Sequence, residues 1–298
     1  MALAAAAAFE GPRLGVRVGA VIVDHGLQPG SAQVAAGVAE LLSQRLGLGP
    51  VCVVPVTVDG PGGPEAAARA ARREALTRTA AATGAGAVLL GHTLDDQAET
   101  VLLRLDRGAG ARSLAGMRER DGLWRRPLLG LRRAQVRQAA LEVGLPVWED
   151  PHNADRSFAR VRVRYDVLPA LEQALGPGVV PALARSAHLL AADADLLDAH
   201  AAAVGTQLDP QSEGRLEVAA LAAQPEAIRL RVLRRALVAA GAPAGKLTAA
   251  HVQQVDRLVT DWHGQGPLAL PGGLGVRRWC GTLELGGSSG SGAPPDDR

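Results

Sequence analysis

The chain has 298 residues, of which 47% are hydrophobic, and its formal net charge is +2. This length exceeds what one hydrophobic core usually serves, so we expect one large domain and a second, smaller one. No apolar run approaches the roughly 20 residues that cross a bilayer, which argues against a membrane protein, and the seven aromatic residues leave little for stacking on nucleic-acid bases.

Cysteine usage indicates a reducing compartment. Cys52 and Cys280 are the two cysteines, and their separation fits neither a metal site nor a redox motif. The alanine-rich opening, residues 1–9, lacks the basic residues of a signal peptide and favours a helix. We therefore expect a cytoplasmic protein.

The first half of the chain alternates strand patterns with helix patterns. After the helical opening we expect strands at 17–24, 51–56 and 87–91, and helices at 31–46, 65–83 and from residue 92 onward. Shorter strands are expected at 123–128 and 146–148, around a helix at 132–143. This alternation predicts an α/β domain over residues 1–150, with a doubly wound parallel sheet that binds ligands at the carboxyl ends of its strands.

From residue 158 onward the pattern becomes helical. Four helical stretches separated by Gly-Pro and Gly-Ala turns predict a mainly helical second domain over residues 151–285. Strand-like pieces at 267–270 and 275–279 suggest a terminal hairpin. Residues 286–298 are rich in Gly, Ser and Pro, have nothing to bury, and are expected to form a disordered tail.

The most informative stretch is Gly91-His-Thr-Leu-Asp-Asp-Gln-Ala-Glu-Thr100. On a helix, His92, Asp95 and Glu99 lie on one face, with Asp96 beside them. Three carboxylates and an imidazole at a helix start could hold Mg²⁺ or a substrate ammonium. An acidic first turn that favours the helix dipole explains the same residues without any ligand.

A basic stretch follows. Residues 104–164 hold 14 Arg against 7 Asp and Glu, a segregation that fits a polyanionic partner. Candidates for contact with RNA phosphates are Arg107, Arg112, Arg160 and Arg164. Ordinary ion pairs with Glu149, Asp150, Asp155 and Asp166 are the alternative.

Several segments occur together in an order typical of one family. They are Val21-Ile-Val-Asp-His-Gly-Leu27, Glu65-Ala-Ala-Ala-Arg-Ala-Ala-Arg72, the stretch from Gly91 to Thr100, Arg107-Gly-Ala-Gly110, Arg126-Pro-Leu-Leu129 and Glu149-Asp-Pro-His-Asn153. In this combination the chain resembles the tRNA(Ile)-lysidine synthetases, which belong to the N-type PP-loop ATPases. The resemblance covers nearly the whole chain and implies an adenine nucleotide alpha hydrolase-like fold.

The resemblance also implies an activity. Members join L-lysine to cytidine 34 of tRNA(Ile) with a CAU anticodon: ATP with Mg²⁺ adenylylates the cytidine, the lysine amine attacks, and AMP and pyrophosphate leave. By position, Asp96 and Glu99 would hold lysine, His92 and Arg72 would lie near the phosphates, and Asp24, His25 and Gly26 would border adenine. Asp95, as the expected metal ligand, completes the expected catalytic set.

The sequence departs from the family at its start. The family's Ser-Gly-Gly-x-Asp-Ser phosphate loop and the strand before it do not occur in the chain, because Met1 corresponds to the position just after that loop. We therefore expect an N-terminally truncated member with a hole in its sheet. Two alternatives remain open: a non-catalytic tRNA-binding remnant, and a related tRNA-thiolating PP-loop enzyme. The sequence does not predict an oligomeric state.

Overall fold

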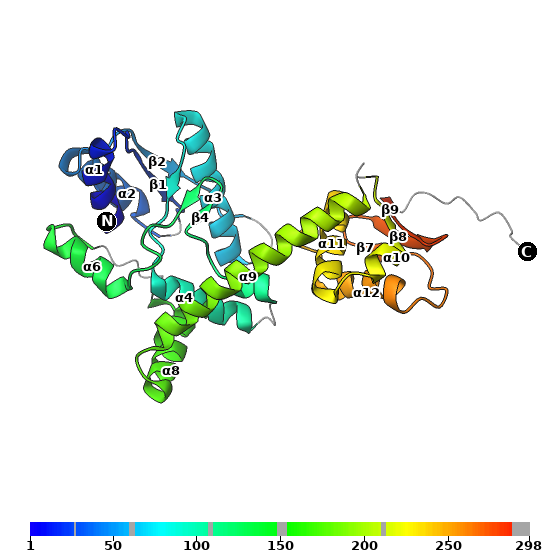
Figure 1. Ribbon diagram of the computed structural model, residues 1–298. Coiled ribbons are helices and arrows are strands. Elements are labelled where there is room, and N and C mark those ends of the chain that lie inside the picture. Colours follow the sequence, from blue (N-terminus) through cyan, green and yellow to red (C-terminus); the bar gives the residue numbers. More distant parts are fainter. Residues whose placement is uncertain (27, 60–62, 107–109, 148–153, 210–212, 288–298) are drawn as a thin grey trace, which may run out of the picture. The chain divides into compact units, whose positions relative to one another are not determined.

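The computed structural model describes residues 1–26, 28–59, 63–106, 110–147, 154–209 and 213–287 (Figure 1). The chain divides into two compact units, Met1–Ala191 and Ala192–Arg298. Within the described residues no single helix has the length and composition to cross a membrane, although a pair bent by 99°, Ala159–Leu175 with Val179–Leu208, meets that criterion by length and composition.

Unit 1 opens with a parallel pair of strands flanked by helices. In chain order its elements are α1 (Ala2–Arg13), β1 (Ala20–Asp24), α2 (Ser31–Glu40), a π-helical turn η1 (Leu41–Arg45) and β2 (Val51–Pro55). β1 and β2 pair in parallel, from Ala20 opposite Val51 to Asp24 opposite Pro55. Both strands lie where the apolar runs predict them, and α2 supplies the crossover that parallel neighbours require.

The second part of unit 1 carries another small sheet. Its elements are α3 (Pro64–Thr83), β3 (Val88–Leu89), α4 (Leu94–Leu105), α5 (Ala111–Leu114), β4 (Arg120–Asp121), β5 (Trp124–Arg125) and α6 (Arg133–Glu142). β5 pairs in parallel with β3 and antiparallel with β4. β1 and β2 form one sheet and β3, β4 and β5 another, with no strand pairing between the two sheets among the described residues. The expected strand at 146–148 is not formed at residues 146 and 147, and residue 148 lies outside the described residues.

A broken helical segment closes unit 1. It consists of α7 (Ala159–Arg162), the π-helical turn η3 (Val163–Val167) and α8 (Leu168–Leu175). Leu168 packs in a buried apolar cluster with Ala98 of α4 and Val180. Because this packing ties the segment to α4, the compact unit extends to Ala191, beyond the boundary expected near residue 150.

Unit 2 combines helices with a four-stranded antiparallel sheet. α9 (Val179–Leu208) runs through the boundary between the units, and β6 (Arg215–Glu217), α10 (Val218–Ala222), α11 (Glu226–Ala239), α12 (Ala249–Thr260), β7 (Leu268–Leu270), β8 (Leu274–Trp279) and β9 (Thr282–Gly287) follow. The strand order is β6-β9-β8-β7. The expected terminal hairpin is thus part of a larger sheet, in which β6 pairs with β9 across a long stretch of sequence.

The core of unit 2 lies between this sheet and its helices. Its fully buried members include Leu221, Leu233, Leu237, Val255 and Leu283, all with 0% exposure. These aliphatic side chains form one continuous cluster, as the scarcity of aromatic residues requires. Of the expected disordered tail, Gly286 and Gly287 belong to β9, and residues 288–298 lie outside the described residues.

Candidate active site

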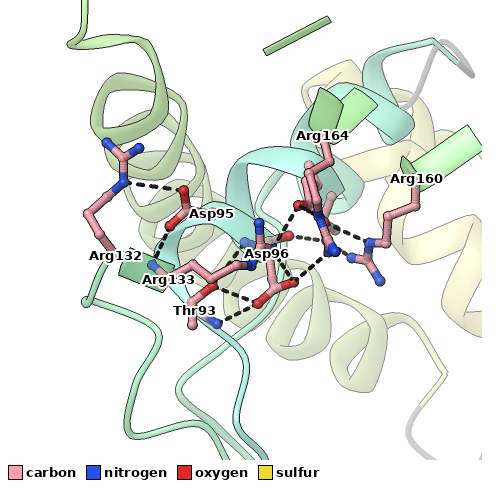
Figure 2. Close-up of polar contacts among 9 residues, drawn as sticks. Thr93, Asp95, Asp96, Arg132, Arg133, Arg160 and Arg164 are labelled. Atoms are coloured by element: carbon pink, nitrogen blue, oxygen red, sulfur yellow. Dashed lines mark hydrogen bonds and ion pairs between the residues drawn. The ribbon is translucent and has the colours of Figure 1, made fainter. Parts of the chain in front are cut away.

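The acidic stretch lies at the start of α4, at the carboxyl end of β3. Thr93 caps the helix: its hydroxyl donates to Asp96 Oδ2 (2.7 Å) and accepts from the Asp96 N–H (3.4 Å), while the Thr93 N–H donates to the same carboxylate (2.8 Å) (Figure 2). His92 precedes this cap, so it does not lie on the helix face where the spacing predicted it. The cap fixes where Asp95, Asp96 and Glu99 project.

Glu99 is fully buried, with 0% of its side chain exposed, and it contacts three guanidinium groups. Arg133 Nη2 and Arg164 Nε each lie 2.8 Å from its Oε1, and Arg160 Nε lies 3.1 Å from its Oε2. These arginines come from α6, η3 and α7, so one carboxylate joins three separate elements to α4. A buried carboxylate with this many charged donors has its desolvation offset by ion pairs.

Asp96 shares two of these arginines. Its Oδ1 lies 3.0 Å from Arg133 Nη2 and 3.6 Å from Arg164 Nη2 (Figure 2). Burial raises the pKa of Asp96, but the hydrogen bonds from Thr93 and the positive charge of Arg133 outweigh it, and the pKa lies below its ordinary value. Asp96 is therefore ionised at neutral pH.

Asp95 is engaged at both carboxylate oxygens. Oδ2 accepts the backbone N–H of Arg133 at 2.7 Å, at the start of α6, and Oδ1 lies 3.3 Å from Arg132 Nε. Among the described residues, no three His, Cys, Asp or Glu side chains come together in a way that could hold a metal ion. The site as folded does not fit a Mg²⁺ ion held by a cage of protein ligands, and Asp95 instead caps α6.

His92 is neutral at physiological pH. Burial is the largest cause, and with the nearby charges of Arg126, Arg160 and Arg69 it lowers the pKa of His92 to about 4, although Asp96 acts in the opposite direction. Its Nδ1 is buried and has no hydrogen-bond partner. A neutral imidazole can accept a proton or a hydrogen bond at one nitrogen and donate at the other.

The loop after β1 holds a second group of predicted residues. Asp24 Oδ1 accepts the backbone N–H of Gly26 at 3.0 Å, and this bond is the main reason that the pKa of Asp24 is lowered. Gly26 has a φ of 62°, a left-handed conformation that suits glycine. His25 Nε2 lies 3.3 Å from Arg72 Nη2, so the structure brings together two residues predicted near the nucleotide.

The predicted RNA contacts differ in their surroundings. Arg112 is exposed on α5, and Arg107 lies outside the described residues. Arg160 and Arg164 contact Glu99, which is not one of the four acids expected as their ion-pair partners. Of those four acids, Asp166 pairs with Arg156, Asp155 accepts the Ser157 N–H at 2.9 Å, and Glu149 and Asp150 lie outside the described residues.

Sequence reasoning missed Arg132 and Arg133. Both stand at the start of α6, where the helix dipole disfavours positive charge. That unfavourable position was a signal, because arginines at a helix start need acidic partners, and Asp95, Asp96 and Glu99 supply them here.

Two sequence families match the chain, one in each part. Residues 1–171 match the PP-loop domain, and residues 216–284 match the TilS substrate binding domain. The PP-loop match agrees with parallel strands whose carboxyl ends carry the polar site. Fold and site thus define a PP-loop protein with an attached substrate-binding domain.

Comparison with curated relatives identifies the family to which this PP-loop protein belongs. The tRNA(Ile)-lysidine synthase of Thermobifida fusca (strain YX) is 56% identical over 283 residues, which are 95% of this chain and 87% of that protein. The enzyme of the same name from Streptomyces coelicolor (strain ATCC BAA-471 / A3(2) / M145) is 56% identical over 290 residues, which are 96% of this chain and 81% of that enzyme. This chain belongs to the tRNA(Ile)-lysidine synthase family.

One solved structure is similar at a lower level. The U34-tRNA thiolase NcsA from Methanococcus maripaludis, with its [4Fe-4S] cluster, has a TM-score of 0.49 and 20% sequence identity over 63% of this chain and 68% of its own. A likeness this low supports no conclusion about activity.

Proposed function

We propose that this chain joins L-lysine to cytidine 34 of tRNA(Ile) with a CAU anticodon, with ATP cleaved to AMP and pyrophosphate through an adenylylated cytidine. The observation that carries the proposal is membership of the tRNA(Ile)-lysidine synthase family over both the PP-loop domain and the TilS substrate binding domain. Because the proposed substrate, cytidine 34, is part of a tRNA, we propose that the protein acts in the cytoplasm.

We assign the lysine ammonium to Asp96, with Glu99 behind it. Asp96 is ionised and 17% exposed, whereas Glu99 has no exposed surface. An ammonium that reaches Asp96 would take the place of an arginine N–H on Oδ1, where Arg164 is the more distant donor at 3.6 Å. Carboxylates that orient an amine for attack serve catalysis by positioning.

For the nucleotide we assign Asp24, His25 and Gly26 to the adenine end, and Arg72 and His92 to the phosphates. The contact between Arg72 and His25 supports this grouping, because a guanidinium group, which can bind phosphate oxygens in pairs, lies beside the loop after β1. Mg²⁺ would accompany ATP through the phosphate oxygens, since this ion commonly keeps few protein ligands. Asp95 could bind it only by giving up its contact with Arg132.

For the tRNA we assign phosphate contacts to Arg107, Arg112, Arg160 and Arg164. Arg112 is exposed and can reach a phosphate directly. Arg160 and Arg164 retain 24% and 18% exposure while they contact Glu99, so they would offer RNA only the donors that face away from it.

The decisive experiment measures incorporation of labelled lysine into a tRNA(Ile) transcript, together with release of AMP. We expect lysine and AMP in equal amounts, and neither with a transcript whose cytidine 34 is replaced by uridine. Binding of tRNA without AMP release would replace the proposal by the non-catalytic tRNA-binding alternative. Incorporation of sulfur would replace it by the thiolating alternative, for which Cys52 and Cys280 are both free thiols.

A further inference from the structure

Gln97 is a buried polar residue of the acidic stretch to which the proposed function assigns no role. It is 5% exposed, and both ends of its side-chain amide bind the backbone of Met117. Nε2 donates to the Met117 carbonyl at 3.0 Å, and Oε1 accepts the Met117 N–H at 2.8 Å. Because each residue advances about 100° around an α-helix, Gln97 and Glu99 project from nearly opposite sides of α4. Gln97 therefore acts on a different segment of the chain from Glu99.

Arg104 lies about two turns further along α4, on the same side of the helix as Gln97. Its Nη1 donates to the carbonyl oxygen of Ser113 and, at 3.0 Å, to that of Gly116. The two side chains together bind residues 113–117 at three carbonyl oxygens and one N–H. We call Gln97 and Arg104 the α4 clamp.

The segment held by the clamp has little regular structure of its own. Its helix α5, Ala111–Leu114, has four residues, far fewer than the roughly 12 to 15 that an isolated helix needs. Gly116 follows with a left-handed φ of 68°, and a Cβ there would lie 2.7 Å from Nε2 of Gln97, so the backbone runs directly against the amide. The position of α5 therefore depends on the α4 clamp.

Arg112 is exposed on α5, whereas the clamp binds backbone atoms of the same segment. The segment runs back along α4, since it contacts Arg104 before it contacts Gln97. A rise of 1.5 Å per residue places Arg104 about 12 Å along the helix axis from Asp96. The clamp thus holds an exposed arginine beside the helix that carries the proposed lysine site.

We propose that Gln97 and Arg104 are positioning residues for tRNA, which hold α5 so that Arg112 meets a phosphate of the RNA backbone. The inference rests on the proposed function, in which Arg112 is assigned to a tRNA phosphate. A guanidinium on a fixed backbone loses less conformational freedom on binding than one on a loose segment, so the clamp strengthens a contact that it does not itself make.

The first test is the salt dependence of tRNA binding by Gln97→Met. This change replaces one neutral side chain by another, so it removes the bonds to Met117 without removing a charge. Binding of a tRNA(Ile) transcript to the full chain should weaken about tenfold or more, as when one charge-assisted hydrogen bond is lost. The slope of log affinity against log salt should decrease by about 0.7 to 0.9, as when one phosphate contact is lost. An unchanged slope would make Gln97 a purely structural residue and overturn the proposal.

A double-mutant cycle with Arg112→Ala shows whether the clamp acts through Arg112. Each single variant should weaken tRNA binding, and the variant that carries both changes should bind no more weakly than the weaker of the two. Additive losses would show that Gln97 affects tRNA by another route. Either additive losses or wild-type binding by Arg112→Ala alone would overturn the proposal.

Two further variants complete the test. Gln138→Met makes the same chemical change at an exposed glutamine of α6, which donates to Glu142 at 3.0 Å, and it should bind tRNA with the wild-type affinity and slope. Arg104→Gln removes the other half of the clamp and should also be non-additive with Arg112→Ala. This second cycle decides the question if Gln97→Met does not fold, and additive losses in it would overturn the proposal.

The lysine-incorporation assay separates this inference from the proposed function. In Gln97→Met the KM for tRNA should rise while the KM for ATP stays unchanged; an equal rise in both would indicate general damage to the fold and overturn the positioning role. Lysine incorporation by the wild type with additive cycles rejects only the α4 clamp. Non-additive cycles in tRNA binding without lysine incorporation reject only the enzymatic function.

Discussion

Arg164 and Glu99, 65 residues apart in the chain, share two hydrogen bonds, from Nε to Oε1 at 2.8 Å and from Nη2 to Oε2 at 3.2 Å. This bidentate contact ties η3 to α4. It also leaves the proposed lysine site filled by protein donors in the free state, so substrate binding must exchange one cation for another.

Glu99→Gln should destabilise the protein by about 3 kcal/mol or more, because it leaves arginines partly buried without their counter-charge. Denaturant unfolding measures this loss. Glu284→Gln is the matched control: Glu284 also contacts two arginines, but Arg215 and Arg277 are 64% and 50% exposed, so its loss should cost about 1 kcal/mol or less. Equal losses of unfolding free energy in the two variants would contradict the role of Glu99 as a buried ion-pair partner.

Asp96→Asn should raise the KM for lysine more than the KM for ATP. The amide keeps the size of the side chain but removes the charge that attracts an ammonium. The measurement is AMP release at varied lysine concentration, with full tRNA and ATP. An unchanged KM for lysine would move the ammonium site away from Asp96.

Arg164→Ala should lower the melting temperature, because it removes the bidentate contact with Glu99. Because the donors of Arg164 that face away from Glu99 are assigned to a tRNA phosphate, this variant should also decrease the slope of log affinity against log salt by about 0.7 to 0.9. Arg112→Ala should decrease the slope by a similar amount and leave the melting temperature unchanged, because Arg112 is exposed. Filter binding over a salt series and thermal melts check both variants, and an unchanged slope for Arg164→Ala would leave this arginine a purely structural role.

Acidification should destabilise the protein between pH 6.5 and 4 through His92. The pKa of His92 is about 4 in the folded protein against 6.5 as its ordinary value. In that window the unfolded chain binds a proton that the folded protein does not, so stability falls as pH is lowered and this contribution is complete below pH 4. His92→Asn should therefore reduce the loss of unfolding free energy between pH 6.5 and 4 by about 1 to 2 kcal/mol. This value is discounted because the imidazole ring is partly exposed to solvent. Melting curves across this pH range test it, with the exposed position His200→Asn as a control.

Leu233→Ala should cost about 2 to 5 kcal/mol in unit 2, because it opens a cavity in a closed aliphatic core. Leu233 has 0% exposure, whereas Leu196, also in unit 2, is 73% exposed. Leu196→Ala should therefore leave the unfolding transition almost unchanged. Similar melting of the two variants would show that the core is looser than described.

Local patterns predicted the elements that bring residues to the site, but not the contacts within it. Apolar runs placed β1 and β2, and the Gly91–Thr100 stretch located the acidic group. Thr93 was not recognised as the N-cap, so His92 was placed on the helix. Which arginines hold Glu99 depends on how α6, α7 and η3 pack on α4, and sequence spacing carries no information about packing between distant segments. The sheet of unit 2 was underestimated for the same reason, since β6 and β9 meet only after folding.

The π-helical turn η3 keeps two kinds of contact in phase. In an α-helix, every fourth residue advances about 40° around the axis, so Arg160, Arg164 and Leu168 would drift away from one face. η3 contains Arg164 and ends directly before Leu168, and its wider turn, closed by i→i+5 bonds, offsets most of that rotation. Both arginines thus contact Glu99, while Leu168 packs in the apolar cluster that contains the neighbouring residue Ala98. Deleting one residue from 165–167 would restore a regular helix. The segment would then lose either the ion pairs with Glu99 or the apolar packing of Leu168.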